Sequence, residues 1–354
     1  MALFPLIRPL IFTLDGERAH RLTIAGLKAL TAGEAPRDDP ALGIRVSGLD
    51  FPNPVGLAAG FDKDGEVFAQ MLRLGFGFAE VGTLTPLPQP GNPKPRLFRL
   101  EEDRAVINRL GFNNGGLDAA RKRLERRGTT GSAAPLRTGI VGVNVGANKD
   151  SSDRIADYVS GVRTMAPVAD YLTINISSPN TPGLRGLQDK GALDELLSAV
   201  TDERSPAGPP VFLKLAPDLD RDGIDDVTDV AIARGIDALI VSNTTISRPG
   251  LRSRFGSEAG GLSGAPLKSL ALEKLREFRS AAGSEIPLIA AGGIETGADA
   301  FARIRAGASL VQLYSALIYE GPGLARRICA ELGRLLDREG FRNVAEAVGT
   351  ERLS

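Results

Sequence analysis

The chain has 354 residues, of which 42% are hydrophobic, so it can bury a sizeable core. Lysine plus arginine and aspartate plus glutamate each total 43, and this balance leaves no basic excess that would indicate nucleic-acid binding. The single cysteine, Cys329, and the single histidine, His20, exclude a disulfide framework, a cysteine metal cluster and a multi-histidine metal site. The chemistry must therefore use serine, lysine, asparagine, threonine, carboxylates or a bound cofactor.

The first forty residues differ from the rest because their apolar residues follow a helical pattern. Pro9 interrupts the first apolar stripe and predicts a short or broken helix. Asp15 is the expected N-cap of a second helix over residues 16–30, and residues 31–40 have the composition of a linker. The first stripe consists of Leu3, Leu6, Ile7, Leu10, Ile11 and Leu14.

Two interpretations of this N-terminal stripe are open. The two helices either pack as a hairpin on the main domain or place an amphipathic face on a membrane surface. The pattern alone favours the hairpin, because most helical apolar stripes belong to a core. The sequence contains no run of 18 apolar residues, so we expect no helix that spans a membrane. The first twelve residues lack the basic region and the cleavage site of a signal peptide.

From about residue 44, short apolar runs alternate with helix-like segments. Eight strands alternating with helices indicate a parallel sheet, and eight strands close a barrel, so we predict an α/β fold: a (β/α)8 TIM barrel with a small N-terminal helical extension. An open doubly wound sheet is the second possibility, although no dinucleotide or P-loop motif follows any strand. The predicted strands cover residues 54–59, 78–83, 139–146, 171–177, 210–216, 238–244, 287–293 and 310–316.

Polar residues follow nearly every predicted strand. In a TIM barrel the carboxyl ends of the strands carry the site, so we expect these residues to gather around one mouth. One asparagine or threonine there would be an ordinary turn residue, but eight polar strand ends together indicate a binding site. These residues include Gly60, Asp62, Lys63, Asp64, Thr83, Asn144, Asn148, Lys149, Asn175, Lys214, Ser242, Asn243, Thr244, Thr245, Gly292, Gly293, Tyr314 and Ser315.

Two features of this mouth indicate an anionic ligand. Lys63 and Lys214 lie within or just after apolar strands, where their charges could neutralise a substrate carboxylate or a reduced cofactor. The pair Gly292–Gly293 lets the backbone approach an anion closely, although such a pair also serves tight turns. At the end of the seventh predicted strand, this pair favours a phosphate-bearing ligand.

The loop NISSPNTPGLR at 175–185 combines many polar groups with two prolines. Pro179 and Pro182 fix φ and so reduce the entropy lost when the loop is ordered against a ligand. Ser177 and Ser178 fit two interpretations about equally well, as turn-capping residues or as functional groups. Amide groups that could bind a planar ring by directional hydrogen bonds come from Asn108, Asn175, Asn180 and Asn243.

Long motifs follow one another in order between about residue 4 and about residue 335. They are GLAAGFDKDGE (56–66), VGTLTPLPQPGNPKPRLFRL (81–100), INRLGFNNGG (107–116), NISSPNTPGLRGLQ (175–188), KLAPD (214–218), SNTT (242–245), GGLSG (260–264) and GASLVQLYSALIYEGP (307–322). Together they resemble the dihydroorotate dehydrogenase family, and in particular its class 2, the membrane-associated branch that reduces quinone.

The resemblance implies that residues 41–354 form an FMN-binding barrel that oxidises (S)-dihydroorotate to orotate in de novo pyrimidine (UMP) biosynthesis. FMN would accept the hydride, and a quinone would be the final electron acceptor. Ser178 would be the catalytic base that removes a proton from the dihydroorotate ring. Class 1 members have a cysteine at that position, so the serine supports class 2.

The resemblance also implies the residues of the site. Phe112 and Thr181 would flank the exit route of the proton, and Ser242 stands where some members have a threonine. The implied substrate-binding residues are Lys63, Asn108, Arg109, Leu110, Gly111, Phe112, Asn175, Asn180, Asn243 and Thr244. The implied cofactor-binding residues are Ala59, Gly60, Phe61, Asp62, Lys63, Thr83, Asn144, Asn175, Lys214, Ser242, Gly264, Gly293, Tyr314 and Ser315.

For residues 1–40, the resemblance favours the membrane interpretation over the plain hairpin. These residues would form a tunnel through which quinone reaches the flavin, with His20 and Arg99 along it and Tyr314 near its inner end. A single short amphipathic element binds membranes only modestly, so we expect peripheral association with the cytoplasmic side of the cell membrane. The resemblance implies no metal, no nucleic acid and no protein partner.

Three alternatives remain open. Another FMN barrel oxidoreductase, or a class 1 enzyme using fumarate or a nicotinamide, would share much of the site, but Ser178 and the N-terminal helices count against class 1. A non-redox phosphate-binding barrel, such as a lyase or an aldolase, would lack flavin absorption. The dense polar strand ends disfavour a non-catalytic binding module.

Overall fold

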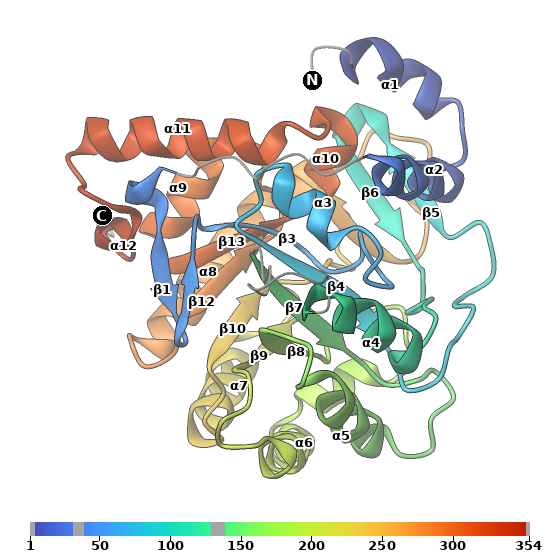
Figure 1. The fold of residues 1–354 in the computed structure, drawn as a ribbon, viewed down its shortest axis with the longest axis vertical. Coiled ribbons are helices and arrows are strands. Elements are labelled where there is room, and N and C mark those ends of the chain that lie inside the picture. Colours follow the sequence, from blue (N-terminus) through green and yellow to red (C-terminus); the bar gives the residue numbers. More distant parts are fainter. Residues whose placement is uncertain (1–3, 31–38, 129–138, 352–354) are drawn as a thin grey trace.

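Eight parallel strands form a closed barrel at the centre of the molecule, in a computed structural model that describes residues 4–30, 39–128 and 139–351 (Figure 1). The strands follow chain order around the barrel, which closes where Val311 pairs with Val55. The predicted TIM barrel is therefore confirmed. Its strands are β3 (Val55–Leu57), β4 (Phe78–Leu84), β7 (Ile140–Val145), β8 (Tyr171–Asn175), β9 (Val211–Leu215), β10 (Ala238–Val241), β12 (Leu288–Ala291) and β13 (Ala308–Leu313).

All eight predicted strands coincide with barrel strands, because strands of a parallel barrel are covered on both faces and read as apolar runs. In β4, for example, all seven residues are buried. The strand predicted at 310–316 is wrong at its end: β13 stops at Leu313, Tyr314 is the N-cap of the next helix, and Ser315 begins it. A short apolar run does not by itself distinguish a strand from a buried helix, and here it continues from one into the other.

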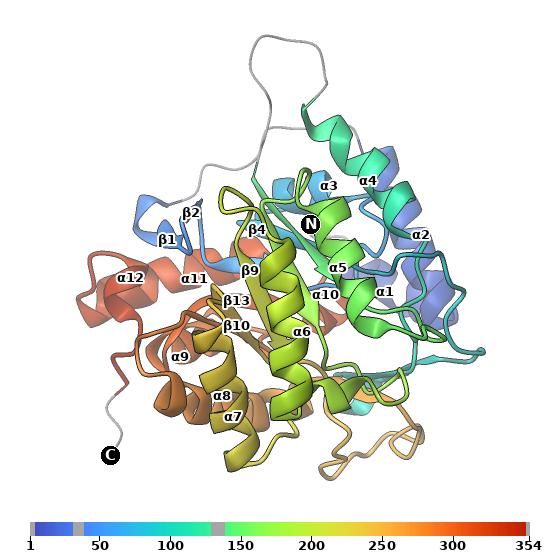
Figure 2. The same ribbon diagram turned by 90° about the horizontal axis from the view of Figure 1, so that it is seen from below.

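Helices surround the barrel, and Figure 2 shows α5, α6 and α7 lying side by side along its outer face. Their starts follow from capping residues: Asp153 caps α5, Asp220 caps α7, and Thr296 and Asp299 form a capping box at α9. The surrounding helices are α3 (Phe68–Arg73), α4 (Leu117–Glu125), α5 (Arg154–Met165), α6 (Lys190–Glu203), α7 (Arg221–Ala233), α8 (Lys268–Ala282), α9 (Gly297–Arg305), α10 (Ser315–Glu320), α11 (Leu324–Glu339) and α12 (Val344–Ala347). Short 3-10 helices are η1 (Pro40–Leu42), η2 (Glu101–Asp103), η3 (Arg126–Gly128), η4 (Leu184–Gln188) and η5 (Ala265–Leu267).

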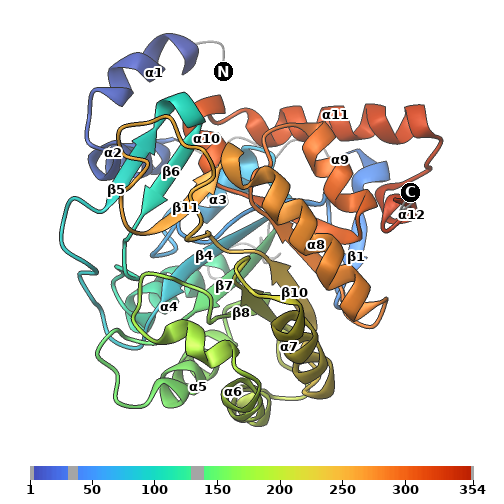
Figure 3. The ribbon, with the colours of Figure 1, turned by 180° about the vertical axis from the view of Figure 1, so that it is seen from behind.

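Two small antiparallel elements lie outside the barrel, and neither was predicted from the sequence. One is a hairpin, and the other is a three-stranded sheet in the order β11–β6–β5 with an apolar cluster of its own (Figure 3). This sheet contributes side chains to the pocket described below, so it matters for the site. The hairpin strands are β1 (Ile44–Val46) and β2 (Leu49–Phe51), and the sheet consists of β5 (Leu97–Leu100), β6 (Ala105–Asn108) and β11 (Gly261–Gly264).

Two N-terminal helices, α1 (Phe4–Phe12) and α2 (Gly16–Ala29), lie beside β5 and β6 (Figure 1). Asp15 caps α2 as predicted, because its side chain accepts hydrogen bonds from two N–H groups of the first turn at 3.0 and 3.1 Å. Helix α1 is short, as predicted, but it continues through Pro9 without a break. Leu3 and most of the predicted linker at 31–40 lie outside the described residues.

Two arginines next to or within β5 attach these helices to the barrel domain. The Arg96 guanidinium forms a buried two-point ion pair with Glu17 of α2, at 2.8 and 3.0 Å, and its hydrogen bonds lower the pKa of Glu17 to about 2. Arg99 donates to the carbonyls of Phe12 (2.9 Å) and Leu14 at the end of α1, and it lies 4.7 Å from the centre of the Phe12 ring. Within the described ranges, no helix is both long and apolar enough to span a membrane.

Candidate active site

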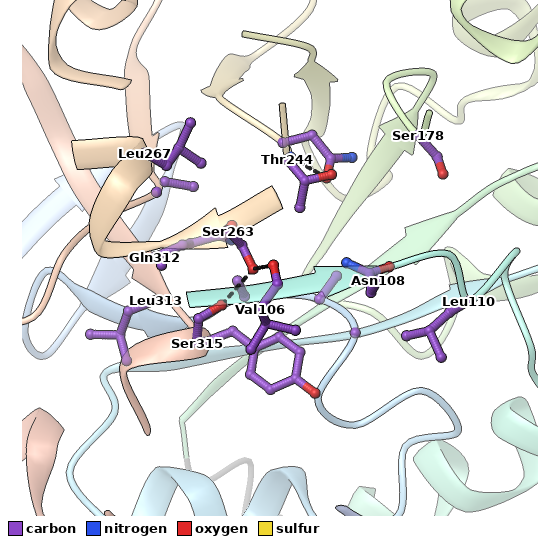
Figure 4. A pocket seen from close by; sticks show the side chains of 18 of the residues that line it. Val106, Asn108, Leu110, Ser178, Thr244, Ser263, Leu267, Gln312, Leu313 and Ser315 are labelled. Carbon is purple, nitrogen blue, oxygen red and sulfur yellow. Dashed lines mark hydrogen bonds between the residues drawn. The ribbon is translucent and has the colours of Figure 1, made fainter. Parts of the chain in front are cut away.

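A pocket opens at the carboxyl ends of the barrel strands and contains about 1260 Å³ of empty space, including its open mouth. Its walls come from the barrel strand ends and from the β5–β6–β11 sheet, as the labelled side chains in Figure 4 show. The predicted gathering of polar strand ends therefore takes place here. The predicted site residues that line the pocket are Ala59, Gly60, Lys63, Thr83, Asn108, Leu110, Gly111, Phe112, Asn175, Ser178, Asn180, Lys214, Ser242, Asn243, Thr244, Gly264, Gly293, Tyr314 and Ser315.

Ser178 lies in the pocket wall with 6% of its surface exposed, on the loop that follows β8. Its hydroxyl oxygen accepts a hydrogen bond from the backbone N–H of Asn180 at 3.2 Å. This bond is the local turn-capping contact that serines make in loops, so the turn-capping interpretation is correct for Ser178. The same bond also fixes the position of the hydroxyl oxygen at the pocket wall. The turn contact is therefore compatible with a functional role for Ser178.

Amide side chains line the pocket near the loop that carries Ser178. The Asn180 amide donates to the Oδ1 atom of Asn108 at 3.2 Å, which connects the loop to the end of β6. The Asn243 amide donates to the hydroxyl of Ser177 at 2.9 Å, which connects the loop to the end of β10. Because these amides come from three different segments, they form a cluster of donors and acceptors around one part of the pocket.

The loop that carries Ser178 is braced from outside by Arg185. This guanidinium donates to the Ser177 carbonyl and to the Thr244 carbonyl, each at 3.0 Å, and forms an ion pair with Asp218 at 2.8 Å. Arg185 therefore ties the loop after β8 to the loop after β10. These bonds and the two prolines restrain the loop in the same sense.

A buried network lies beneath the amide cluster, inside the barrel. The Asn175 amide donates to Thr83 at 3.0 Å and to Asn144 at 3.1 Å, and Asn144 donates in turn to a carboxylate oxygen of Glu80 at 2.8 Å. Glu80 is fully buried, and the Lys214 ammonium lies 3.9 Å from it. Burial lowers the pKa of Lys214, while the Glu80 charge opposes this shift. Lys214 thus lines the pocket with a carboxylate behind it.

Lys63 is the second lysine at this mouth. Its ammonium donates to the Gly60 carbonyl at 2.9 Å, and burial lowers its pKa to about 8. A lysine with this pKa is still mostly protonated at neutral pH. It can therefore neutralise an anionic group bound in the pocket.

The end of the pocket beside Ser315 is lined by glycines in conformations that other residues rarely adopt. Gly264, Gly292 and Gly293 have φ values of +102°, +110° and +68°. A side chain at Gly293 would place its Cβ 2.4 Å from the Cα of Lys268, so the backbone here packs too closely for any other residue. The Ser315 hydroxyl donates to that of Ser263 at 2.8 Å (Figure 4).

Some predicted site residues stand behind the pocket wall rather than in it. Asp62 accepts hydrogen bonds from two backbone N–H groups of its own loop at 2.7 and 2.8 Å. Arg109 forms an ion pair with Glu258 at 2.7 Å. Asn144 supports Asn175 from below, as described above, and Phe61 packs against neighbouring rings. Asp62 and Arg109 therefore hold the backbone that shapes the wall.

His20 of α2 connects the pocket to the N-terminal helices. Its ring is 5.4 Å from the Phe61 ring, edge to face, and 6.4 Å from the ring of Tyr314, which lines the pocket. Burial lowers the pKa of His20 to about 3, so its side chain is neutral at physiological pH. Arg99 lies instead at the end of α1, so the two predicted tunnel residues occupy different parts of the junction between helices and barrel.

Sequence reasoning missed several residues that shape the site. Glu80 and Gln312 are buried in the barrel and joined by a 2.8 Å hydrogen bond, and Gln312 lines the pocket. A polar residue inside the apolar runs FAEVGT and LVQLY was the signal that could have revealed them. Ser263 and Leu97 also line the pocket, but they belong to the small sheet that was not predicted.

Comparisons with known proteins show the family of this chain. A profile of the family described as dihydroorotate dehydrogenase matches residues 41–336. The chain is 60% identical over 349 residues to the dihydroorotate dehydrogenase (quinone) of Erythrobacter litoralis, which covers 99% of this chain and 100% of that relative. It is 61% identical over 351 residues to the protein of the same name from Novosphingobium aromaticivorans, with 99% and 100% coverage. The ligand-free type DHODH from Eimeria tenella superposes with a TM-score of 0.90 at 45% identity, over 96% of this chain and 100% of that chain.

The profile match includes the barrel, the small sheet and the pocket. The similarity to the two bacterial relatives also extends over the N-terminal helices, since it covers 99% of the chain. The family resemblance inferred from the sequence motifs is thus confirmed. The chain belongs to the dihydroorotate dehydrogenase family, and within it to the quinone-dependent class 2.

Proposed function

We propose that this protein oxidises (S)-dihydroorotate to orotate with FMN bound at the barrel mouth, and that a quinone takes up the electrons. The observation that carries the proposal is one pocket with two chemically different parts. One part contains Ser178 among asparagine amides, and the other contains glycines with positive φ beside Ser315. The group proposed to remove the proton and the proposed place for a phosphate-bearing cofactor therefore share one cavity.

FMN fits the residues of this pocket. The glycine-lined end leaves room for a phosphate group, because Gly264, Gly292 and Gly293 place no side chain at the pocket wall. The buried ammonium of Lys214 and the amide of Asn175 can hold the carbonyl-bearing edge of the ring system. When bound, FMN supplies the hydride-accepting chemistry. The other residues proposed to hold it are Ala59, Gly60, Phe61, Asp62, Lys63, Thr83, Asn144, Ser242, Tyr314 and Ser315.

The substrate is proposed to lie in the asparagine-lined part of the pocket. Its ring carbonyls and N–H groups would pair with the side chains of Asn108, Asn180 and Asn243, and Lys63 would face its carboxylate. The side chains of Asn108 and Asn180 face one another, since the Asn180 Nδ2 atom lies 3.2 Å from the Asn108 Oδ1 atom. The other residues proposed for substrate binding are Arg109, Leu110, Gly111, Phe112, Asn175 and Thr244.

Ser178 is proposed to remove the proton from the dihydroorotate ring. A serine hydroxyl is a weak base at its ordinary pKa, so the proton must be passed on as it is taken up. Thr181 is a candidate for this relay, since its hydroxyl is buried and has no hydrogen-bond partner among the described residues. Phe112, with a φ of +51°, lines the pocket as Ser178 does and is proposed to flank the exit route with Thr181.

Residues 1–40 are proposed to form a separate extension that brings quinone from the membrane to the barrel at 41–354. The exposed face of α1 and α2 supports this role, because Leu6 and Leu10 are 77% and 72% exposed although both are apolar. His20 is proposed to lie along the quinone path near Tyr314, and Arg99 near its outer part. With this role we propose peripheral association with the cytoplasmic side of the cell membrane.

The choice of electron acceptor tests the proposal. Purified protein is expected to contain about one FMN per chain and to oxidise dihydroorotate with a soluble quinone analogue, but not with fumarate or NAD⁺ as the acceptor. Flavin content is measured from the absorption of FMN released on denaturation, and turnover from the formation of orotate. Efficient use of fumarate or NAD⁺ as the acceptor would contradict the assignment to class 2 and favour class 1. A flavin-free protein would favour a non-redox barrel.

A further inference from the structure

Arg303 of α9 is a buried arginine that the proposed function does not use. Only 1% of its surface is exposed. Its Nη2 atom donates to the carbonyl of Lys268 at 2.6 Å and to the carbonyl of Gly292 at 3.3 Å. Its Nε atom is buried and has no hydrogen-bond partner among the described residues. The guanidinium therefore lies directly behind the loop that lines the glycine-rich end of the pocket.

The charge of Asp299 acts on Arg303 and opposes the lowering of its pKa by burial, but the two groups do not form an ion pair. Within the described part of the chain, no carboxylate lies within ion-pair distance of its guanidinium. The nearest acidic residue on the same helix is Asp299, which is already paired with the Lys268 ammonium at 3.0 Å and with the capping box of Thr296. Burial lowers the pKa of Arg303 to about 10, so it stays charged at neutral pH. A buried cation with only carbonyl partners favours an anion nearby.

The contact with Gly292 also orients the loop. In a trans peptide the C=O of one residue and the N–H of the next point in opposite directions, and the Gly292–Gly293 bond is trans. Because the Gly292 carbonyl points to Arg303, the Gly293 N–H points away from it, toward the side on which Gly293 lines the pocket. Among the described residues this N–H has no hydrogen-bond partner. It is thus available to a ligand.

We propose that Arg303 is a positioning residue for the phosphate group of the flavin. From behind the loop it turns the Gly293 N–H into the pocket, and its buried charge favours a phosphate monoester there over an uncharged group. This inference rests on the proposed function, since it concerns the cofactor proposed above. According to this inference, Arg303 is the residue that makes the protein bind a phosphorylated flavin more tightly than the same flavin without phosphate.

The test compares FMN with riboflavin, which has the same ring system and no phosphate. Full-length wild-type protein and its Arg303→Gln variant are loaded with each flavin, and dissociation constants are measured from the fluorescence of flavin released on dilution. In the variant the dissociation constant for FMN is expected to rise by about 10- to 100-fold, because the Gly293 N–H loses its orientation and the buried charge is removed, while that for riboflavin stays unchanged. Arg303→Lys, which keeps the charge, is expected to recover part of the loss.

The matched control is Arg305→Gln, which removes the same charge from the same helix. The Arg305 guanidinium bonds to the carbonyl of Thr350 at 3.4 Å and does not line the pocket, so both dissociation constants should remain those of the wild type. Equal weakening of FMN and riboflavin in Arg303→Gln would mean a purely structural role and would overturn the inference. So would an unchanged ratio of the two constants.

Two further outcomes separate this inference from the proposed function. If wild-type protein binds neither flavin, the proposed function fails, whereas binding of both flavins with equal affinity overturns only the phosphate assignment. If Arg303→Gln does not fold, Arg303→Met replaces it, since an apolar residue of similar length often substitutes for a buried charge without loss of stability. For Arg303→Met we expect the same change in the ratio of the dissociation constants for FMN and riboflavin. A wild-type ratio in that variant overturns the inference.

Discussion

Ser178 combines a local structural contact with a position at the pocket wall. The bond from the Asn180 N–H fixes its hydroxyl oxygen, and Arg185 fixes the carbonyl of the preceding residue. A catalytic base gains from such restraint, because proton transfer requires the donor and acceptor atoms to be within hydrogen-bond reach. The turn contact therefore supports the proposed role of Ser178 as a base.

Lys63 gives the site a pH dependence that can be measured. Its pKa of about 8 in the flavin- and substrate-free protein means that the ammonium loses its proton as the pH rises through this value. Since the proposed partner is the carboxylate of the substrate, kcat/KM for dihydroorotate is expected to fall above about pH 8. The measurement is kcat/KM between about pH 6 and about pH 10.

Two variants make this pH test specific. Lys63→Met is expected to have a lower kcat/KM and no alkaline decline with this pKa. Lys149→Met is the control. Lys149 lies near the same mouth, but its side chain is exposed and its ammonium donates to the Asn92 side chain at 3.1 Å. The control variant should keep the decline. An identical alkaline decline in Lys63→Met would show that another group is responsible.

Glu80 stabilises the barrel interior as the acceptor of a buried network. It accepts hydrogen bonds from Asn144, Tyr171, Thr173 and Gln312 at 2.8 to 3.2 Å, and it balances the nearby Lys214 charge. Replacement by leucine leaves these donors and the cation without their acceptor. The free energy of unfolding, measured by urea denaturation, is therefore expected to fall by about 3–5 kcal/mol in the Glu80 variant.

An exposed ion pair provides the comparison for Glu80→Leu. Glu203 pairs with Arg163 at 2.7 Å, but the Arg163 side chain is 67% exposed. Glu203→Gln should leave the free energy of unfolding close to that of the wild type, because water screens an exposed ion pair. Similar small changes for both variants would mean that the network around Glu80 contributes little to stability.

At the scale of elements, α1 and α2 combine firm attachment with an exposed apolar face. The Glu17–Arg96 pair is buried and Arg99 binds the end of α1, so these helices are packed on the barrel domain as a hairpin would be. Leu6 and Leu10 nevertheless remain exposed. The helices therefore pack on the barrel domain, but the stripe is not their packing face, because Leu6, Ile7, Leu10 and Leu14 are exposed.

The exposed face of α1 leads to a membrane-binding prediction. In the double variant Leu6→Glu, Leu10→Glu, the partition coefficient onto phospholipid vesicles is expected to fall at least about tenfold, because two apolar side chains would no longer enter the interface. Sedimentation with vesicles measures the bound fraction. Flavin reduction by dihydroorotate should stay unchanged, since neither leucine lines the pocket.

Leu87→Glu is the control for this experiment. Leu87 is 67% exposed, but it lies on the loop after β4, where its N–H bonds to Asn148. Its substitution should leave vesicle binding unchanged. Equal vesicle binding by the double variant and the wild type would mean that the α1 face serves only packing.

The barrel strands could be predicted from the sequence, whereas the small sheet could not. Every barrel strand is an apolar run because both of its faces are covered. The β5–β6–β11 sheet joins segments some 150 residues apart, such as Ile107 and Leu262, and its strands have four residues each. Local periodicity contains no information about such pairing, so Ser263 and its bond to Ser315 were not foreseen.

At the scale of the whole molecule, the barrel explains how separated motifs form one site. Parallel strands bring their carboxyl ends to one mouth. The polar residues that follow the predicted strands therefore identified most of the pocket from the sequence alone. This sequence pattern did not distinguish residues in the wall from those behind it. Asp62, for example, turns back to its own backbone, and Glu80 points into the barrel, where only three-dimensional packing decides the partner.

The central claim is that Ser178 removes a proton while the neighbouring ring carbon transfers a hydride to bound flavin. The most direct measurement is anaerobic mixing of the flavin-loaded protein with dihydroorotate, followed by the loss of flavin absorbance. Wild-type protein is expected to bleach in a single turnover, and Ser178→Ala, with the same FMN content, should bleach about 10²- to 10⁴-fold more slowly. Bleaching of Ser178→Ala at the wild-type rate, or no bleaching of the wild type, would contradict this account.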